Sequence, residues 1–280
     1  MRLYQSFRRA SVALAAVFTL TGCTQRLYFP DRANTPGLSE ALEGKITASW
    51  KGQATSTDGL GTERGAGSSF ALDAAFAPIN HLGITASYRG LNDRVVGSEK
   101  VFLPNDESVY RTALYQGYRW DGAVGYFNTF DRLGRYEIYA GGGAGELRRR
   151  GATEAQYDYT TRYMRYYVQP AVGIGNQVIV LMGGVRILAQ RYNSFSAPDP
   201  QRVRYVTDAL GERSIVGQAI VCAEPFINGE VGYRFLKFNL QIGSSLKLAG
   251  PRVMGAIPVY GCAGITLHFA PSFLKGFGSR

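Results

Sequence analysis

The sequence predicts an all-β protein: a closed, antiparallel, up-and-down barrel of ten strands that crosses a membrane, with eight strands as the alternative. Three observations predict it. Apolar and polar residues alternate along most of the chain, short and long connections follow each other in turn, and the 280 residues include 35 Gly, 18 Tyr and 15 Phe. Aromatic residues favour strands, and glycine allows a sheet to curve tightly.

Alternation with a period of two residues predicts the individual strands. It is clearest between residues 236 and 246, where Phe238 and Leu240 share one face and Lys237 and Asn239 share the other. The same pattern predicts ten strands in all, at about 43 to 53, 67 to 77, 82 to 90, 117 to 129, 135 to 147, 161 to 175, 178 to 192, 220 to 234, 236 to 248 and 258 to 269.

The connections between these strands alternate in length. Four are tight turns, near residues 80, 132, 176 and 235, and the five between them are longer and rich in charge, Gly, Ser or Pro. Each class therefore lies at its own end of a meander, and closing the meander removes its two unpaired edges. Strands of about ten residues are long enough to cross a bilayer. Apolar residues are expected outside and charged residues inside, as in membrane barrels.

The first 22 residues have the pattern of a secretory signal. Arg2, Arg8 and Arg9 precede a short apolar run that is too short to span a bilayer. Leu20, Thr21, Gly22 and Cys23 then resemble the lipobox of bacterial lipoproteins, which implies cleavage before Cys23 and acylation of that residue with fatty acids such as palmitate. We expect residues 1 to 22 to be the signal peptide, 23 to 42 a lipidated periplasmic tether, 43 to 269 the barrel and 270 to 280 a C-terminal tail.

Assigning faces by alternation places charges of both signs inside the barrel. The interior of a ten-stranded barrel is narrow, and an isolated buried ion is costly, so these groups should pair. The sequence predicts a lumen plugged by salt bridges and tyrosines, with a small solute pore as the alternative. The charged residues predicted to line the lumen are Asp73, Asp121, Glu137, Arg165, Arg186, Glu224, Glu230 and Lys237, together with Arg119.

Other candidate sites are few. Cys222 and Cys262 could pair in an oxidising compartment or stay as two buried thiols. No metal site, cofactor or nucleic-acid partner is expected. His81 and His268 fall at the predicted periplasmic end, so we expect no enzyme, the alternative being a hydrolase acting on lipid A or peptides. Arg148, Arg149 and Arg150 lie in a long connection and could bind phosphates of lipopolysaccharide, or form a solvated rim.

The last predicted strand contains Gly264, Leu267 and Phe269, which resemble the C-terminal assembly signal of Gram-negative outer-membrane barrels. Residues 23 to 269 resemble small barrels of the OmpA and OmpX type, and more closely a group of uncharacterised lipoprotein barrels with a segment like Leu27 to Pro36. The resemblance implies an outer-membrane location with the N-terminus and lipid in the periplasm. It also implies that the protein contacts outer-membrane lipid and interacts with the barrel-assembly and lipoprotein-export machineries. It implies no activity, and the oligomeric state stays open.

Overall fold

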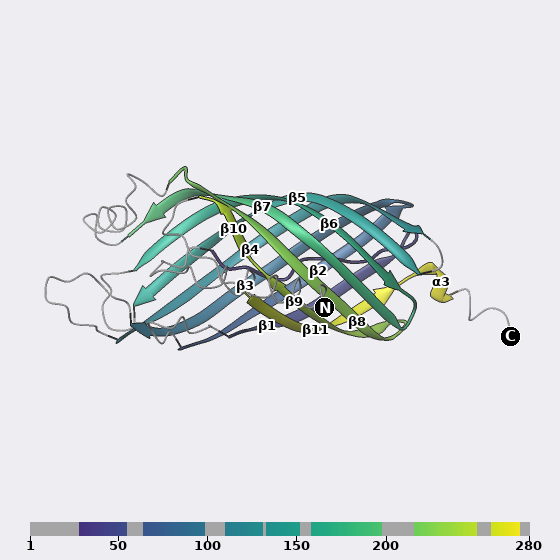
Figure 1. The fold of residues 1–280 in the computed structure, drawn as a ribbon, viewed down its shortest axis with the longest axis horizontal. Helices are drawn as coiled ribbons and strands as arrows, with labels where there is room; N and C mark the ends of the chain where they lie inside the picture. Colours follow the sequence, from purple (N-terminus) through teal and green to yellow (C-terminus); the bar gives the residue numbers. More distant parts are fainter. Residues whose placement is uncertain are drawn as a thin grey trace, which may run out of the picture.

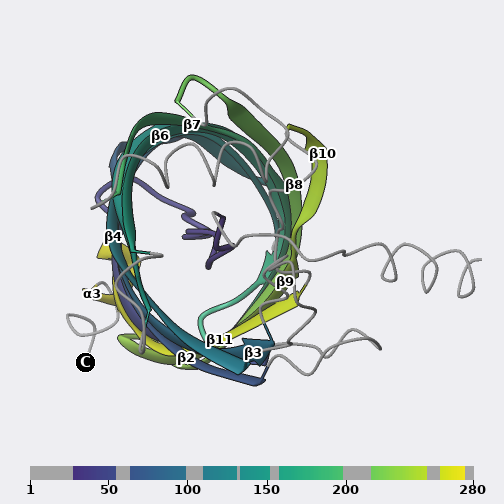
Figure 2. The ribbon, with the colours of Figure 1, turned by 90° about the vertical axis from the view of Figure 1, so that its left-hand side faces the viewer.

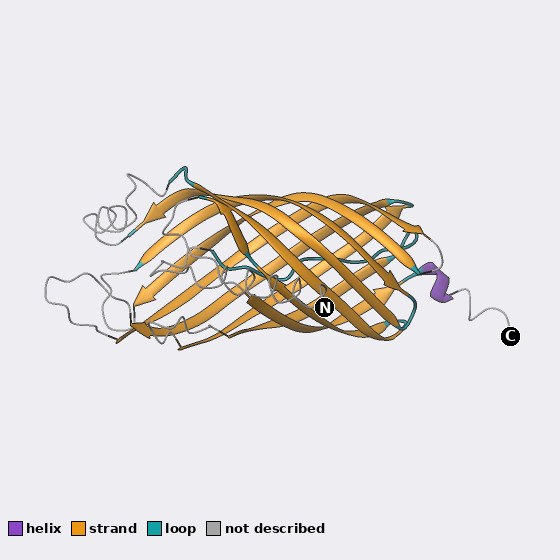
Figure 3. Ribbon diagram, in the orientation of Figure 1, coloured by secondary structure: helices purple, strands orange, loops and turns teal. Residues whose placement is uncertain are grey.

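The protein is a closed antiparallel β-barrel, shown in Figures 1 and 3. The computed structural model describes residues 28–54, 64–98, 110–130, 133–151, 158–197, 216–250 and 259–274. Its elements are β1 (Gly44–Ala54), β2 (Arg64–Ile79), β3 (Leu82–Ser98), β4 (Tyr110–Phe130), β5 (Gly134–Gly151), β6 (Tyr159–Gly175), β7 (Ile179–Ser196), β8 (Ala219–Tyr233), β9 (Leu236–Ser244), β10 (Leu246–Ala249), β11 (Val259–Phe269) and the short helix α3 (Pro271–Leu274).

The barrel closes because β1 pairs with both β2 and β11, while β9 pairs with both β8 and β11. β9 and β10 are two pieces of one strand, interrupted at Ser245, and β10 pairs with β8. The wall therefore consists of ten strands, each antiparallel to its neighbours. This confirms the predicted ten-stranded barrel, and the alternative of eight strands is wrong.

The tight turns gather at one end of the barrel, which we call the short-turn end. Asn80 and His81 join β2 to β3 there, and Arg234 and Phe235 join β8 to β9. Helix α3 follows β11 at the same end, on the right in Figure 1. The longer connections join the strands at the opposite end, the long-loop end. No helix among the described residues is long and apolar enough to cross a membrane.

The two faces of the wall differ sharply in polarity. On β4, large apolar side chains such as Trp120, Val124 and Phe130 are exposed on the outer face, whereas Arg119 and Asp121 are buried on the inner face. The run from Trp120 to Phe130 has the length of about 9–11 residues that a tilted strand needs to cross a bilayer. An apolar outer belt around a polar interior is the reverse of a water-soluble protein.

Glycine on β5 makes room for the charged interior. Gly143 lies between Asp121 on β4 and Arg165 on β6 in the pairing register. A Cβ atom at position 143 would collide with the Asp121 side chain. The glycines between residues 141 and 145 therefore relieve crowding in the lumen.

Candidate functional site

The chain from Tyr28 to Leu38 passes through the interior of the barrel, and we call this stretch the lumen segment. Figure 2 shows it as the purple trace inside the ring of strands. It has no strand pairing of its own, and both Tyr28 and Leu38 are only 1% exposed. Residues 28 to 38, which the sequence assigns to a lipidated periplasmic tether over residues 23 to 42, lie inside the barrel, where the wall supplies them with polar and apolar partners.

At the short-turn end the chain bends from the lumen segment into β1. Leu42, with a positive φ of 61°, donates a backbone hydrogen bond to the carbonyl of Ala77 at 2.6 Å. Leu38 packs inside this end against Ala77 and Phe127. The apolar contact and the backbone hydrogen bond together fix the end of the segment that leads into β1.

Gly37 carries a second special conformation, with φ of 55°. Its N–H donates to Glu137 Oε2 at 2.9 Å, and its carbonyl accepts from Arg135 at 2.6 Å. Val180 and Met182 lie 3.6 and 3.7 Å from where a Cβ atom would be. Glycine at this position allows the backbone to present both polar groups to β5.

The middle of the segment is held by side-chain amides of the wall. Gln241 bonds the backbone of Ala33 in both directions, accepting from its N–H at 2.7 Å and donating to its carbonyl at 3.0 Å. Gln169 donates to the carbonyl of Asn34 at 2.8 Å, and Asn34 donates to Ser87 Oγ at 3.2 Å. These bonds replace the strand pairing that an extended segment would otherwise need.

Asp31 lies among four arginines that come from four different strands. Its carboxylate is 2.7 Å from Arg186, 3.2 Å from Arg89 and 3.7 Å from Arg165, and it also pairs with Arg119. Asp31 is 8% exposed. The lumen segment therefore supplies a negative charge to a cationic ring on the wall.

Carboxylates of the wall complete this charged centre. Because β2, β3 and β4 run antiparallel in register, Asp73 faces Ser87, and Ser87 faces Asp121. The ion pairs join Arg32 and Arg89 to Asp73, Arg119 and Arg165 to Asp121, and Arg186 to Glu224.

The charges of the centre nearly balance only while the Asp31 carboxylate is present. Five arginines (32, 89, 119, 165 and 186) face four carboxylates (31, 73, 121 and 224), so the net charge is +1. Without the Asp31 carboxylate, the net charge of the same groups would be +2. Buried ions are tolerated only when paired in this way.

The part of the segment nearest the long-loop end is aromatic. Tyr28 donates its hydroxyl hydrogen bond to Glu224, and the ring of Phe29 lies 5.4 Å from that of Tyr115. Lys51 donates to a carbonyl oxygen of the segment. Tyr28 belongs to a buried cluster whose members include Tyr159, the first residue of β6.

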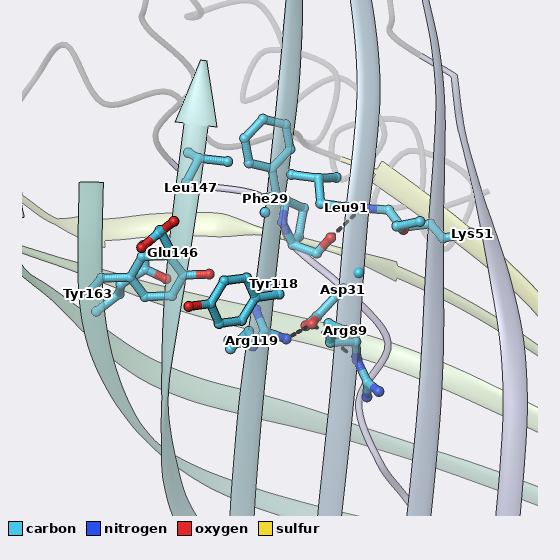
Figure 4. A pocket seen from close by; sticks show the side chains of 15 residues that line it. Phe29, Asp31, Lys51, Arg89, Leu91, Tyr118, Arg119, Glu146, Leu147 and Tyr163 are labelled. Carbon is cyan, nitrogen blue, oxygen red and sulfur yellow. Dashed lines mark hydrogen bonds and ion pairs between the residues drawn. The ribbon is translucent and has the colours of Figure 1, made fainter. Parts of the chain in front are cut away.

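A small cavity lies beside Asp31 and is shown in Figure 4. Its volume is about 50 Å³, and its lining includes Phe29, Arg89, Arg119 and Tyr163. A single water needs about 10–15 Å³ of such space, so the cavity has room for a few waters. The charged centre is thus filled by protein groups.

A second set of lumen charges lies nearer the short-turn end. Lys45 on β1 pairs with Glu230 on β8 at 3.3 Å, and Lys237 is fully buried on β9. Glu137 on β5 is also buried and receives the N–H of Gly37. All nine lumen charges named from the sequence are buried in the interior, joined by Asp31 and Arg32, which sequence reasoning did not identify.

The two histidines lie at the short-turn end. His268 Nε2 is 2.5 Å from Glu43 Oε1, and the edge of Phe273 covers its ring. Burial raises the pKa of Glu43, but its hydrogen bond with His268 and other nearby groups outweigh burial and lower the pKa to about 2. The second carboxylate oxygen accepts from Ser39, whose hydroxyl points at Glu43. Both side chains of this pair are buried. His81 bonds the carbonyl of Phe127.

The three consecutive arginines divide between the two faces of β5. Arg149 is buried, whereas Arg148 and Arg150 are exposed on the outer face. Arg148 pairs at 2.7 Å with Glu146, which also pairs at 2.9 Å with Arg162 of β6. These residues form an outward-facing charged cluster above the apolar belt, toward the long-loop end.

Cys222 and Cys262 are buried free thiols on β8 and β11, with β9 between those strands. In the predicted assembly signal, Leu267 and Phe269 are exposed on the outer face of β11, and Gly264 packs against β1. Among the described residues, no three His, Cys, Asp or Glu side chains gather as a metal site would require. Cys23 and the predicted signal peptide lie outside the described residues.

Comparison with known proteins gives distant structural likenesses. No family model matches the chain, and no curated protein matches it. The chain is similar to the translocator domain of the autotransporter NalP from Neisseria meningitidis, with 10% identity, 96% of each chain covered and a TM-score of 0.46. It is also similar to the transport unit of the autotransporter AIDA-I from Escherichia coli, with 10% identity, 86% of this chain and 93% of that chain covered, and a TM-score of 0.36. A third likeness is to OmpT, an outer-membrane protein of Vibrio cholerae, with 8% identity, 81% of this chain and 96% of that chain covered, and a TM-score of 0.25.

Proposed function

We propose that this protein is a lipid-anchored outer-membrane β-barrel that is closed by its own N-terminal segment and serves a structural or surface-interaction role. The observation that carries the proposal is the lumen segment, which is buried and bonded to the wall from Gly37 up to Tyr28. A barrel whose interior is filled by its own chain is suited to scaffolding and contact, and its outer belt is suited to lipid.

The location is tested by the behaviour of the folded protein in cell membranes. We expect it to stay with the outer-membrane fraction in high salt and to migrate differently on a gel before and after heating. Radiolabelled palmitate should label the wild-type chain and not Cys23→Ala. Extraction by salt alone would contradict membrane insertion, and unlabelled wild-type protein would contradict the lipid anchor.

The closed lumen is tested in planar bilayers. We expect purified wild-type protein to give no stepwise conductance, because the segment fills the space that ions would cross. Frequent openings of the wild type would favour the alternative of a small pore, in which Arg165 and Arg186 would set the selectivity.

The surface role is proposed to include the phosphates of lipopolysaccharide. Arg148 and Arg162 point outward, are 52% and 71% exposed, and lie where the apolar belt ends. Arginine is well suited to phosphate groups. Replacing both by Ala should reduce the lipopolysaccharide that copurifies with the barrel, while Arg234→Ala, in the turn between β8 and β9 at the short-turn end, serves as the control. Equal amounts in all three proteins would contradict this contact.

A further inference from the structure

The lumen segment has a direction, which bears on where the N-terminus lies. The segment joins β1 at the short-turn end, where Ala41 donates its N–H to Asn80 Oδ1 at 3.0 Å. From there, going backward along the chain, Gly37 contacts Glu137, and Phe29 contacts Tyr115. The purple trace in Figure 1 runs from the short-turn end toward the long-loop end.

The axial distance that the segment covers can be worked out from β5. Glu137 marks the level of Gly37, and Arg149, paired with Tyr115, marks the level of Phe29. Twelve residues of a strand rise roughly 40 Å, a tilt of about 40° leaves roughly 30 Å along the barrel axis, and the eight residues from Gly37 to Phe29 themselves reach at most roughly 26–29 Å. That is about the thickness of the hydrocarbon core of a bilayer.

The lumen between Tyr28 and the short-turn end is occupied by described residues of the protein. Between Tyr28 and the short-turn end the lumen holds the segment itself and the charged centre around Asp31, where a cavity of about 50 Å³ has room for only a few waters. Cys23 is five residues from Tyr28, and five extended residues reach at most roughly 18 Å. This reach is shorter than the axial distance from Tyr28 to the short-turn end.

We propose that the N-terminus, with the lipid on Cys23, lies on the long-loop side of the barrel, which is the cell-surface side. This inference rests on the proposed function, namely on a lipidated Cys23 and on a barrel with short turns in the periplasm and long loops outside. It replaces the expected periplasmic position of the lipid. The acyl chains then reach the outer leaflet, and the segment that leads to them runs through the barrel.

The experiment places an epitope tag after Thr24 in the full chain and detects it with antibody on intact cells. The same tag inserted in the turn after Asn176 serves as the short-turn control, and a tag inserted at residue 205 serves as the long-loop control. We expect the N-terminal and long-loop tags to be detected on intact cells and the turn tag only after permeabilisation. Detection of the N-terminal tag only after permeabilisation, with the long-loop tag accessible, would overturn the inference.

A second variant shows whether the segment is seated when the tag is detected. Asn34→Cys with Ser87→Cys, in a chain that also carries Cys222→Ser and Cys262→Ser, should form a disulfide across a pair of side chains now 3.2 Å apart. Detection of the N-terminal tag on intact cells in the cross-linked protein supports the inference. Detection of that tag only after permeabilisation overturns it. Loss of palmitate labelling or of heat-modifiable migration would instead remove the proposed function, so the two failures can be told apart.

Discussion

Replacing Asp31 by Asn removes the one negative charge that the lumen segment gives to the arginine ring. The side chain keeps its size, but the centre then holds five arginines and three carboxylates. Removing one partner from a buried ion pair costs about 3–5 kcal/mol, since it leaves an uncompensated charge. The wall keeps its strand pairing, so we expect this cost to fall on the seating of the segment.

A cost of that size shifts the balance between seated and displaced segment by roughly 10²- to 4 × 10³-fold, because each 1.4 kcal/mol is a factor of ten. We therefore expect Asp31→Asn to show channel openings in planar bilayers far more often than the wild type. The open state should prefer anions, because the remaining groups of the centre carry a net positive charge.

The matched control is Glu146→Gln, which also removes a buried carboxylate between two arginines, but its arginine partners, Arg148 and Arg162, are 52% and 71% exposed. It should leave the conductance at the wild-type level. Adding Arg119→Gln to Asp31→Asn should reduce the openings, because Asp121 keeps Arg165 and the net charge returns to +1. Equal opening frequencies for Asp31→Asn, Glu146→Gln and the wild type would refute the assignment of Asp31 as the residue that seats the segment.

Three further predictions concern the ends of the segment and the thiols. Gly37→Val should increase the openings in the same assay, because a branched side chain is strained at φ of 55°; unchanged conductance would contradict the close fit. The lowered pKa of Glu43 contributes stability to the folded barrel that is present above its ordinary pKa of 4.5 and is lost as the pH falls toward 2. The temperature of heat modification should therefore drop between pH 4.5 and pH 2. Glu43→Gln should abolish the part of this drop that depends on the contact of Glu43 with His268. Cys222 and Cys262 should react with a maleimide only after unfolding, and a lack of reaction in the unfolded protein would indicate a disulfide.

The wall of the barrel could be predicted because each strand carries the alternation of apolar and polar residues that its two environments require. A strand that faces lipid on one side and charge on the other must alternate, and ten such stretches were visible without knowledge of pairing. The inner positions of Asp121 and Arg165 follow from the same alternation. Their partners do not, because register between distant strands depends on how the whole sheet closes.

The lumen segment could not be predicted by periodicity, since its backbone is bonded to side chains and has no repeating pattern. Tyr28 and Phe29 were the available signal, because a solvated tether gains nothing from two adjacent aromatic residues. Pro30 and Pro36 favour an extended chain, which suits a narrow lumen as well as it suits a linker. Only the positions of the arginines on four strands show that Asp31 belongs inside.

The four arginines of the wall and Asp31 of the lumen segment compensate each other's charge. Arg89, Arg119, Arg165 and Arg186 converge in a narrow interior, where their repulsion would oppose closure of the barrel if nothing compensated it. The wall carboxylates supply three compensating charges, and Asp31 supplies the fourth at the point where the four guanidinium groups meet. Asp31 is therefore an internal counterion of the wall arginines, and its neighbour Arg32 pairs with the wall carboxylate Asp73, so the segment is held by two opposite charges that each have partners on the wall.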